Sequence, residues 1–120
     1  MKDERFYLGH IRSAISDIRT YASVGEESFL ADRMRQDAII RKLEIIGEAV
    51  KRLSEATRAQ RPEIPWKQIA GMRDRLTHAY FGVDLNLVWR VVERDLQRLE
   101  HAVDVMLTGA GVSDSPTDIG

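Results

Sequence analysis

One stretch of the 120-residue chain decides its fold: residues 39–53 read IIRKLEIIGEAVKRL. The apolar positions recur at steps of four, three, four and three, at Ile39, Leu43, Ile46, Val50 and Leu53. This rhythm is typical of a helix within a bundle. Ile40, Ile45 and Ala49 widen the apolar arc, so the helix must pack against more than one neighbour. We therefore predict a long central helix over about residues 28–59.

Three more apolar patterns at helical spacing lie outside this stretch. The first contains Leu8, Ile11, Ile15, Ile18 and Ala22, with Asp3 as its expected cap and Gly25 as its expected stop. A shorter helix should start near Trp66, after Pro62 and Pro65, and run toward Gly82. The last pattern contains Val88, Val92, Leu96, Leu99, Val103 and Met106, between an Asp84 cap and a stop at Gly109.

These patterns predict an all-α fold. The chain shows no internal repeat and no convincing strand, and 120 residues are enough for one domain with a hydrophobic core. We predict a helical domain over residues 1–108. Residues 109–120 are rich in Gly, Ser, Pro, Thr and Asp, so a flexible tail is expected there.

The composition limits the kinds of function. A formal charge of -1 gives no global attraction to nucleic acid, so any RNA contact must rest on a local group of cations. With no cysteine and no dense group of metal-ligating residues, we expect no metal and no cofactor. The chain also has no apolar run long enough for a membrane span and no signal peptide, which favours the cytoplasm.

The segment that can carry chemistry is RDRLTHAY, residues 73–80. Cleaving a phosphodiester without a metal needs groups that move protons and a cation that stabilises the charged phosphorus centre. Histidine and arginine suit these roles. At 100° per residue, Asp74 and His78 share a helix face, so the carboxylate could orient the imidazole. Arg73 and His78 lie roughly 140° apart, so either Arg73 reaches round the helix or a second subunit contributes.

An Arg, then a His four to six positions on, then any residue and a Tyr, is the signature of HEPN ribonucleases, and this chain resembles their HepT-like branch. The flanking sequence strengthens the likeness: Ile46-Gly47-Glu48-Ala49-Val50 in the central helix, residues 65–72 (PWKQIAGM) before the motif, and Phe81-Gly82-Val83-Asp84 with Val88-Trp89 after it. The likeness spans roughly residues 3–107.

The resemblance implies a four- to five-helix HEPN bundle that dimerises, so that two copies of the motif line one cleft. It implies a metal-independent endoribonuclease, the toxin of a toxin-antitoxin system, with Arg73 and His78 as catalytic residues and Asp74 in support. It also implies a partner, a minimal nucleotidyltransferase antitoxin that uses ATP to add AMP units to Tyr80. A bulky anionic group there would block a phosphate-binding cleft.

Plainer interpretations stay open beside this one. Tyr80 could plug the end of the bundle, and Asp74 could simply pair with Arg75 or His78. Glu48 lies in the wide apolar region of the central helix and is expected to pair with an arginine near the cleft, which makes it a supporting residue. The whole chain could instead be a non-catalytic module that binds the nucleotidyltransferase, or a dimerisation domain whose motif is a relic.

The basic residues of the central region leave a similar choice. Arginines 33, 35, 41, 52, 58 and 61, together with Lys42 and Lys51, could form a strip that faces RNA. They are spread over several helix faces, however, and acidic residues stand close by in the sequence. We expect them to be solvated charges with acidic partners.

Overall fold

The computed structural model describes residues 3–78 and 84–114, and the side chains at positions 73, 76–78 and 110–114 are outside the description. The first helix, α1 (Glu4–Ala22), begins where the sequence predicts. The Asp3 carboxylate accepts a hydrogen bond from the Arg5 amide at 2.9 Å and so caps the helix. After α1 the chain turns at Gly25, whose φ of 94° is a backbone conformation that favours glycine.

The predicted central helix over residues 28–59 is wrong in its extent, because three helices occupy this region. They are α2 (Glu26–Ala31), α3 (Arg33–Lys51) and α4 (Glu55–Ala59). Asp32 separates the first two: its backbone is extended, and its carboxylate accepts from the Arg35 amide at 3.2 Å. Ser54 caps α4 in the same way, since its hydroxyl accepts from the Thr57 amide. Short polar side chains that cap a new helix therefore override a continuous apolar pattern.

The second half of the chain contains α5 (Trp66–His78), α6 (Leu85–Arg90), the π-helical turn η1 (Val91–Asp95) and α7 (Leu96–Asp114). Asp84 caps α6 as predicted, accepting from two backbone amides. The predicted helix stop at Gly109 is wrong, because α7 continues to Asp114. A glycine lowers helix propensity but does not by itself end a helix. The predicted stop at Gly82 lies outside the described residues.

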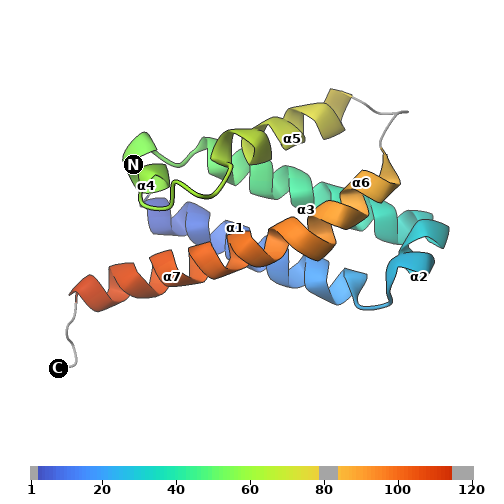
Figure 1. The fold of residues 1–120 in the computed structure, drawn as a ribbon, viewed down its shortest axis with the longest axis horizontal. Coiled ribbons are helices and arrows are strands. Elements are labelled where there is room, and N and C mark those ends of the chain that lie inside the picture. The colour runs from blue at the N-terminus through green and yellow to red at the C-terminus, as the bar shows by residue number, and fades with distance from the viewer. Residues whose placement is uncertain (1–2, 79–83, 115–120) are drawn as a thin grey trace.

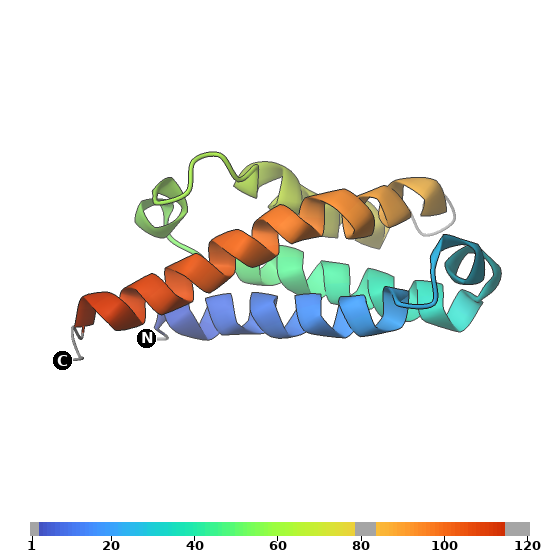
Figure 2. The same cartoon turned by 60° about the horizontal axis from the view of Figure 1, so that its bottom comes forward.

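The long helices pack side by side around one core (Figures 1 and 2). Helix α3 lies between α1 and α5, and α7 packs along α1. Most of the residues predicted to face the core are buried, including Ile11, Ile15, Ile18, Ile39, Leu43, Ile46, Val50 and Val103, whereas Ala22, Ile40, Ile45 and Val92 are partly buried. The prediction of an all-α bundle is therefore confirmed. None of the described helices is long and apolar enough to cross a membrane.

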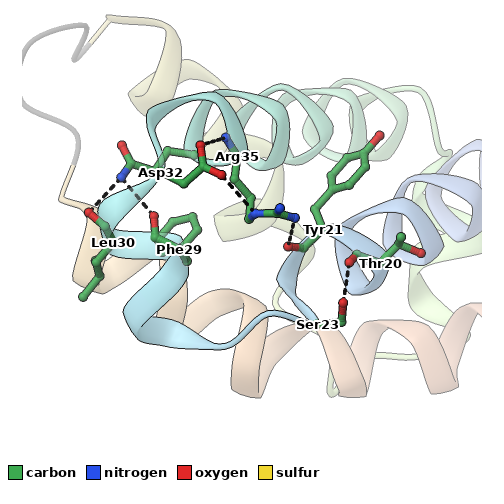
Figure 3. A network of polar contacts seen from close by, with 8 residues as sticks. Thr20, Tyr21, Ser23, Phe29, Leu30, Asp32 and Arg35 are labelled. Atoms are coloured by element: carbon green, nitrogen blue, oxygen red, sulfur yellow. Dashed lines mark hydrogen bonds and ion pairs between the residues drawn. The ribbon is translucent and has the colours of Figure 1, made fainter.

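One corner of the bundle is held by polar contacts to backbone carbonyl groups (Figure 3). The Arg35 guanidinium donates to the Tyr21 carbonyl at 2.8 Å, which ties α3 to the end of α1. Its Nε lies 3.4 Å from an Asp32 oxygen, close enough for charge attraction but not aligned as a hydrogen bond. The Gln36 amide donates to the carbonyls of Phe29 and Leu30. These contacts fix α2 against α3 and place Phe29 in the core, where its ring lies 5.2 Å from that of Trp89.

Candidate functional site

The helix that carries the predicted motif is anchored at its first residue. The Trp66 indole is buried and donates to the carbonyls of Arg58 and Arg61, at 2.9 and 3.0 Å. A tryptophan that packs in the core and also satisfies its N–H sets where α5 begins and how it is rotated. Helix α5 then lies along α3 through Ile69, Ala70 and Met72, which pack on the core. Its opposite side is left toward solvent.

The predicted site residues lie on two neighbouring helices. Positions 73, 74 and 78 are on α5, and Glu48 is on α3, which packs against it. The side chains of Arg73 and His78, and Tyr80 as a whole, lie outside the described residues. Whether Asp74 contacts His78 therefore stays a prediction, and so do the catalytic roles of Arg73 and His78.

The described contacts of Asp74 include one that the sequence did not suggest. The Lys51 ammonium group donates to both carboxylate oxygens of Asp74, at 3.0 and 3.2 Å, and so joins α3 to the motif helix. Sequence reasoning considered Arg75 and His78 as partners and missed Lys51. The two residues are 23 apart in the chain, and only the packing of α3 on α5 brings them together. No local spacing in the sequence signals this pair.

Glu48 pairs with an arginine, as expected. The Arg52 guanidinium lies 3.3 Å from a Glu48 oxygen, one helical turn further along α3. The Glu48 side chain is 45% exposed, so burial is not what demands this partner. The pair therefore lies at the surface beside Lys51, at the end of α3 that faces the motif helix. Surface pairs of this kind contribute at most about 1 kcal/mol to stability.

Most of the basic residues that could have formed an RNA-facing strip have acidic partners instead. Ion pairs join Arg35 to Asp32, Arg41 to Glu44, Lys42 to Asp17, Lys51 to Asp74, Arg52 to Glu48 and Arg61 to Glu63. The hydrogen bond to Asp17 raises the pKa of Lys42. The hydrogen bond from Arg61 lowers the pKa of Glu63. This agrees with the interpretation of these cations as solvated, paired charges.

The described residues do not include a cluster of side chains that could bind a metal ion. Among them, no group of three or more His, Asp or Glu side chains is placed to hold an ion. The described site residues are a carboxylate held by an ammonium group and a carboxylate held by a guanidinium, both at the surface. Paired charges of this kind do not themselves attract a phosphate, but they can position neighbouring groups.

The structure is an all-α bundle in which α5, packed against α3, carries positions 73 and 78 of the Arg-x4-His-x-Tyr motif. Comparison with protein-family models identifies the family: residues 11–106 match the model described as "Ribonuclease HepT-like". The chain belongs to this family.

Its relatives agree with that assignment. A "Probable ribonuclease HepT" of Thermococcus cleftensis is 43% identical over 82% of this chain and 91% of its own. A "Putative RNase" of Caldanaerobacter subterraneus subsp. tengcongensis is 41% identical over 89% of this chain and 96% of its own. A Methanocaldococcus jannaschii protein named "Gamma-glutamylcyclotransferase and putative RNase" is 45% identical over 85% of this chain, which spans only 46% of that protein. No solved structure matches the chain.

Proposed function

We propose that this protein is a metal-independent endoribonuclease, the toxin of a toxin-antitoxin pair, and that a partner nucleotidyltransferase silences it by adding AMP to Tyr80. The observation that carries the proposal is the intact sequence motif of residues 73–80, which begins within α5, in a chain of the ribonuclease HepT-like family. Both RNA and a nucleotidyltransferase that uses ATP would be met in the cytoplasm.

In the proposed cleavage reaction, the residues of the motif transfer protons and stabilise negative charge. His78 takes the proton from a ribose 2′-hydroxyl as its oxygen attacks the neighbouring phosphorus, and it returns a proton to the 5′-oxygen as the P–O5′ bond breaks. The products are a 2′,3′-cyclic phosphate and a 5′-hydroxyl. Arg73 holds the phosphate and stabilises its added negative charge. Asp74 supports His78, and Lys51 keeps Asp74 in place from α3.

A second copy of the chain completes the site in this proposal. On one ideal helix, positions 73 and 78 point roughly 140° apart, so a single α5 does not readily aim both at one phosphate. Two copies of α5 facing one cleft would supply an arginine from one chain and a histidine from the other. Mixing Arg73→Ala protein with His78→Ala protein should then restore activity that neither variant has alone. Each mixed dimer contains one intact site, with Arg73 from the His78→Ala chain and His78 from the Arg73→Ala chain.

The test of the nuclease proposal uses purified wild-type protein and mixed-sequence RNA in excess EDTA. We expect cleavage that EDTA does not diminish, with products ending in 2′,3′-cyclic phosphate, and no cleavage of the same RNA when every ribose is 2′-O-methylated. Cleavage of the methylated RNA, or activity that appears only with added Mg²⁺, would overturn the mechanism. Complete inertness of the folded protein would favour a non-catalytic module that binds the nucleotidyltransferase.

The silencing step has its own test. In it, the Tyr80 oxygen attacks the α-phosphorus of ATP and pyrophosphate leaves. Incubation with ATP and a nucleotidyltransferase encoded beside this chain should add 329 Da or multiples of it to the wild type (roughly the mass of each AMP residue) and abolish RNA cleavage. Tyr80→Phe should gain no mass and keep its activity. Loss of activity without added mass would contradict the proposal.

A further inference from the structure

The outward face of α5 has a feature that the motif does not use. Gly71 lies in the middle of this helix, where a glycine lowers stability relative to alanine. In the described structure, a Cβ added at Gly71 would meet no neighbouring atom within 4 Å. The folding of the chain on itself therefore gives no reason for a glycine here. Because Gly71 has no side chain, another molecule can come close to the backbone of α5 at this position.

Helical geometry places Gly71 in register with the motif. Position 78 is seven residues further on, which at 100° per residue returns to within roughly 20° of the direction of Gly71. The two positions are separated by about 10 Å along the axis, from the rise of 1.5 Å per residue. An extended polymer chain bound along this face of α5 would therefore pass Gly71 and reach position 78.

Charge gives the face its second property. Lys67 and Arg75 stand one turn to either side of Gly71, both are exposed, and neither forms an ion pair within the described part of the chain. The one acidic residue on this side, Asp74, is held by Lys51 through both of its oxygens. Eight other described cations have acidic partners, whereas Lys67 and Arg75, like six further arginines, form no ion pair among the described residues and can bind an anion. An arginine also suits a phosphate because its donors can bind two oxygens at once.

We propose that the face of α5 formed by Lys67, Gly71 and Arg75 is the surface along which the sugar-phosphate backbone of single-stranded RNA lies on its way to the motif. Gly71 lets the backbone come close to the helix, and the two cations bind the phosphates on either side. This inference rests on the proposed ribonuclease function for its choice of RNA, but it predicts binding whether or not the RNA is cut.

Openness alone does not mark such a surface, and the chain offers a matched control. Gly9 on α1 is also in a helix and also has no atom within 4 Å of an added Cβ. Its helix carries no part of the motif, and Arg12, one turn further on, is paired with Glu100 and Asp104. Gly9 therefore has the same local geometry without a pair of available cations and without the register to position 78.

The experiment measures binding of a fluorescent, 2′-O-methylated single-stranded RNA to the full-length protein over a range of salt concentrations. Each lost phosphate contact should reduce the slope of log affinity against log salt by about 0.7. Lys67→Gln combined with Arg75→Gln should therefore lower the slope by about 1.4, and the affinity by about 25-fold near 0.1 M salt. Arg5→Gln with Arg33→Gln removes two exposed cations from α1 and α3, and should leave the slope unchanged.

The glycine pair gives the second arm. Gly71→Leu should weaken binding of this RNA by about tenfold or more, and Gly9→Leu should leave it unchanged, while both variants melt at or above the wild-type temperature because leucine favours helix. Equal losses in both cation pairs, or unaltered binding by Gly71→Leu, would overturn the proposal. A change of molecular mass in light scattering with Gly71→Leu but not Gly9→Leu, at unchanged RNA affinity, would show that a second copy occupies this face instead. Normal binding by a wild type that never cuts RNA would refute the nuclease and leave this surface standing.

Discussion

The two ends of α3 meet their neighbours in different ways. At its first turn, Arg35 and Gln36 hydrogen-bond to backbone carbonyls of α1 and α2, around a completely buried Phe29 (Figure 3). At its last turn, Glu48 and Lys51 make ion pairs at the surface, and Lys51 reaches across to the motif helix. Contacts to backbone in a partly buried setting around a buried ring hold a fold, whereas exposed pairs contribute little to stability. Stability and the candidate site therefore depend on opposite ends of one helix.

The largest effect on stability is expected from Phe29→Ala. Phe29 is completely buried between α2 and α6, where it contacts Trp89, and removing its ring leaves a cavity. We expect the free energy of unfolding to fall by about 3–5 kcal/mol, measured by urea denaturation. Met34→Ala, at a residue that is 82% exposed on the same corner, should change it by less than about 0.5 kcal/mol. Similar losses in the two variants would break the contrast between the ends of α3.

Arg35→Met should have the next largest effect. The substitution removes the charged donor of the Tyr21 carbonyl and the partner of Asp32, while it keeps much of the aliphatic stem. We expect a loss of about 1.5–3 kcal/mol in the free energy of unfolding. Arg33→Met, at an exposed neighbour, is the matched control and should be nearly neutral. An equally small loss from Arg35→Met would mean that the corner is held by apolar packing alone.

Lys51→Met tests the other end of α3. Both partners of the Lys51–Asp74 pair are partly exposed, at 38% and 46%, so the free energy of unfolding should change by less than about 1 kcal/mol. If Asp74 supports His78, RNA cleavage should nevertheless fall by roughly 10- to 100-fold, the cost of a small misplacement at a catalytic centre. Lys51→Arg should recover much of the activity. A variant that loses stability and activity in proportion would assign Lys51 to the fold alone.

The smallest effect concerns the first residue of α1. Burial acts to raise the pKa of Glu4, but hydrogen bonds from Thr57 and Ser54, with the charge of Arg58, hold that pKa below its usual value. A lowered carboxyl pKa stabilises the fold above the pKa of the unfolded chain, and this stabilisation is lost as the pH falls through the folded pKa. Wild type should therefore lose a few tenths of a kcal/mol more than Glu4→Gln between about pH 6 and pH 3. Identical pH curves in urea denaturation would contradict this.

Much of the fold followed from apolar periodicity and capping residues. The spacing of Leu8, Ile11, Ile15 and Ile18 placed α1, and the aspartates at positions 3 and 84 mark helix starts in sequence and structure alike. The break at Asp32 was missed because apolar residues continue on both sides of it. A residue type that favours helix caps was visible there, but only the packing of α2 under α3 decides that the chain turns.

The π-helical turn also left a trace in the sequence. Val88, Val92 and Leu96 follow one another at two successive steps of four, and in an ideal α-helix each such step drifts by roughly 40°. In the structure the Leu96 amide donates to the Val91 carbonyl, five residues back. This turn contains more residues than an α-helical turn, so the three apolar residues stay on the same side of the helix.

The candidate site was less predictable than the fold. The motif can be read from the sequence because its residues are close together in the chain. The Lys51–Asp74 pair cannot, because it depends on how α3 and α5 are rotated against each other, which the burial of Trp66 and the core residues of α5 determines. Predicting a contact between helices requires knowing how the helices pack, whereas a contact within one helix can be predicted from the helical period alone.

The role of His78 as a catalytic residue can be tested by measuring RNA cleavage in EDTA by His78→Ala beside His10→Ala. His10 is an exposed histidine on α1 that packs against Phe6 in a tilted arrangement, 4.4 Å between ring centres, and takes no part in the motif. We predict that His10→Ala cleaves at the wild-type rate and that His78→Ala, equally folded, loses at least about 100-fold. Wild-type cleavage by His78→Ala would contradict the assignment of this end of α5 as a ribonuclease site.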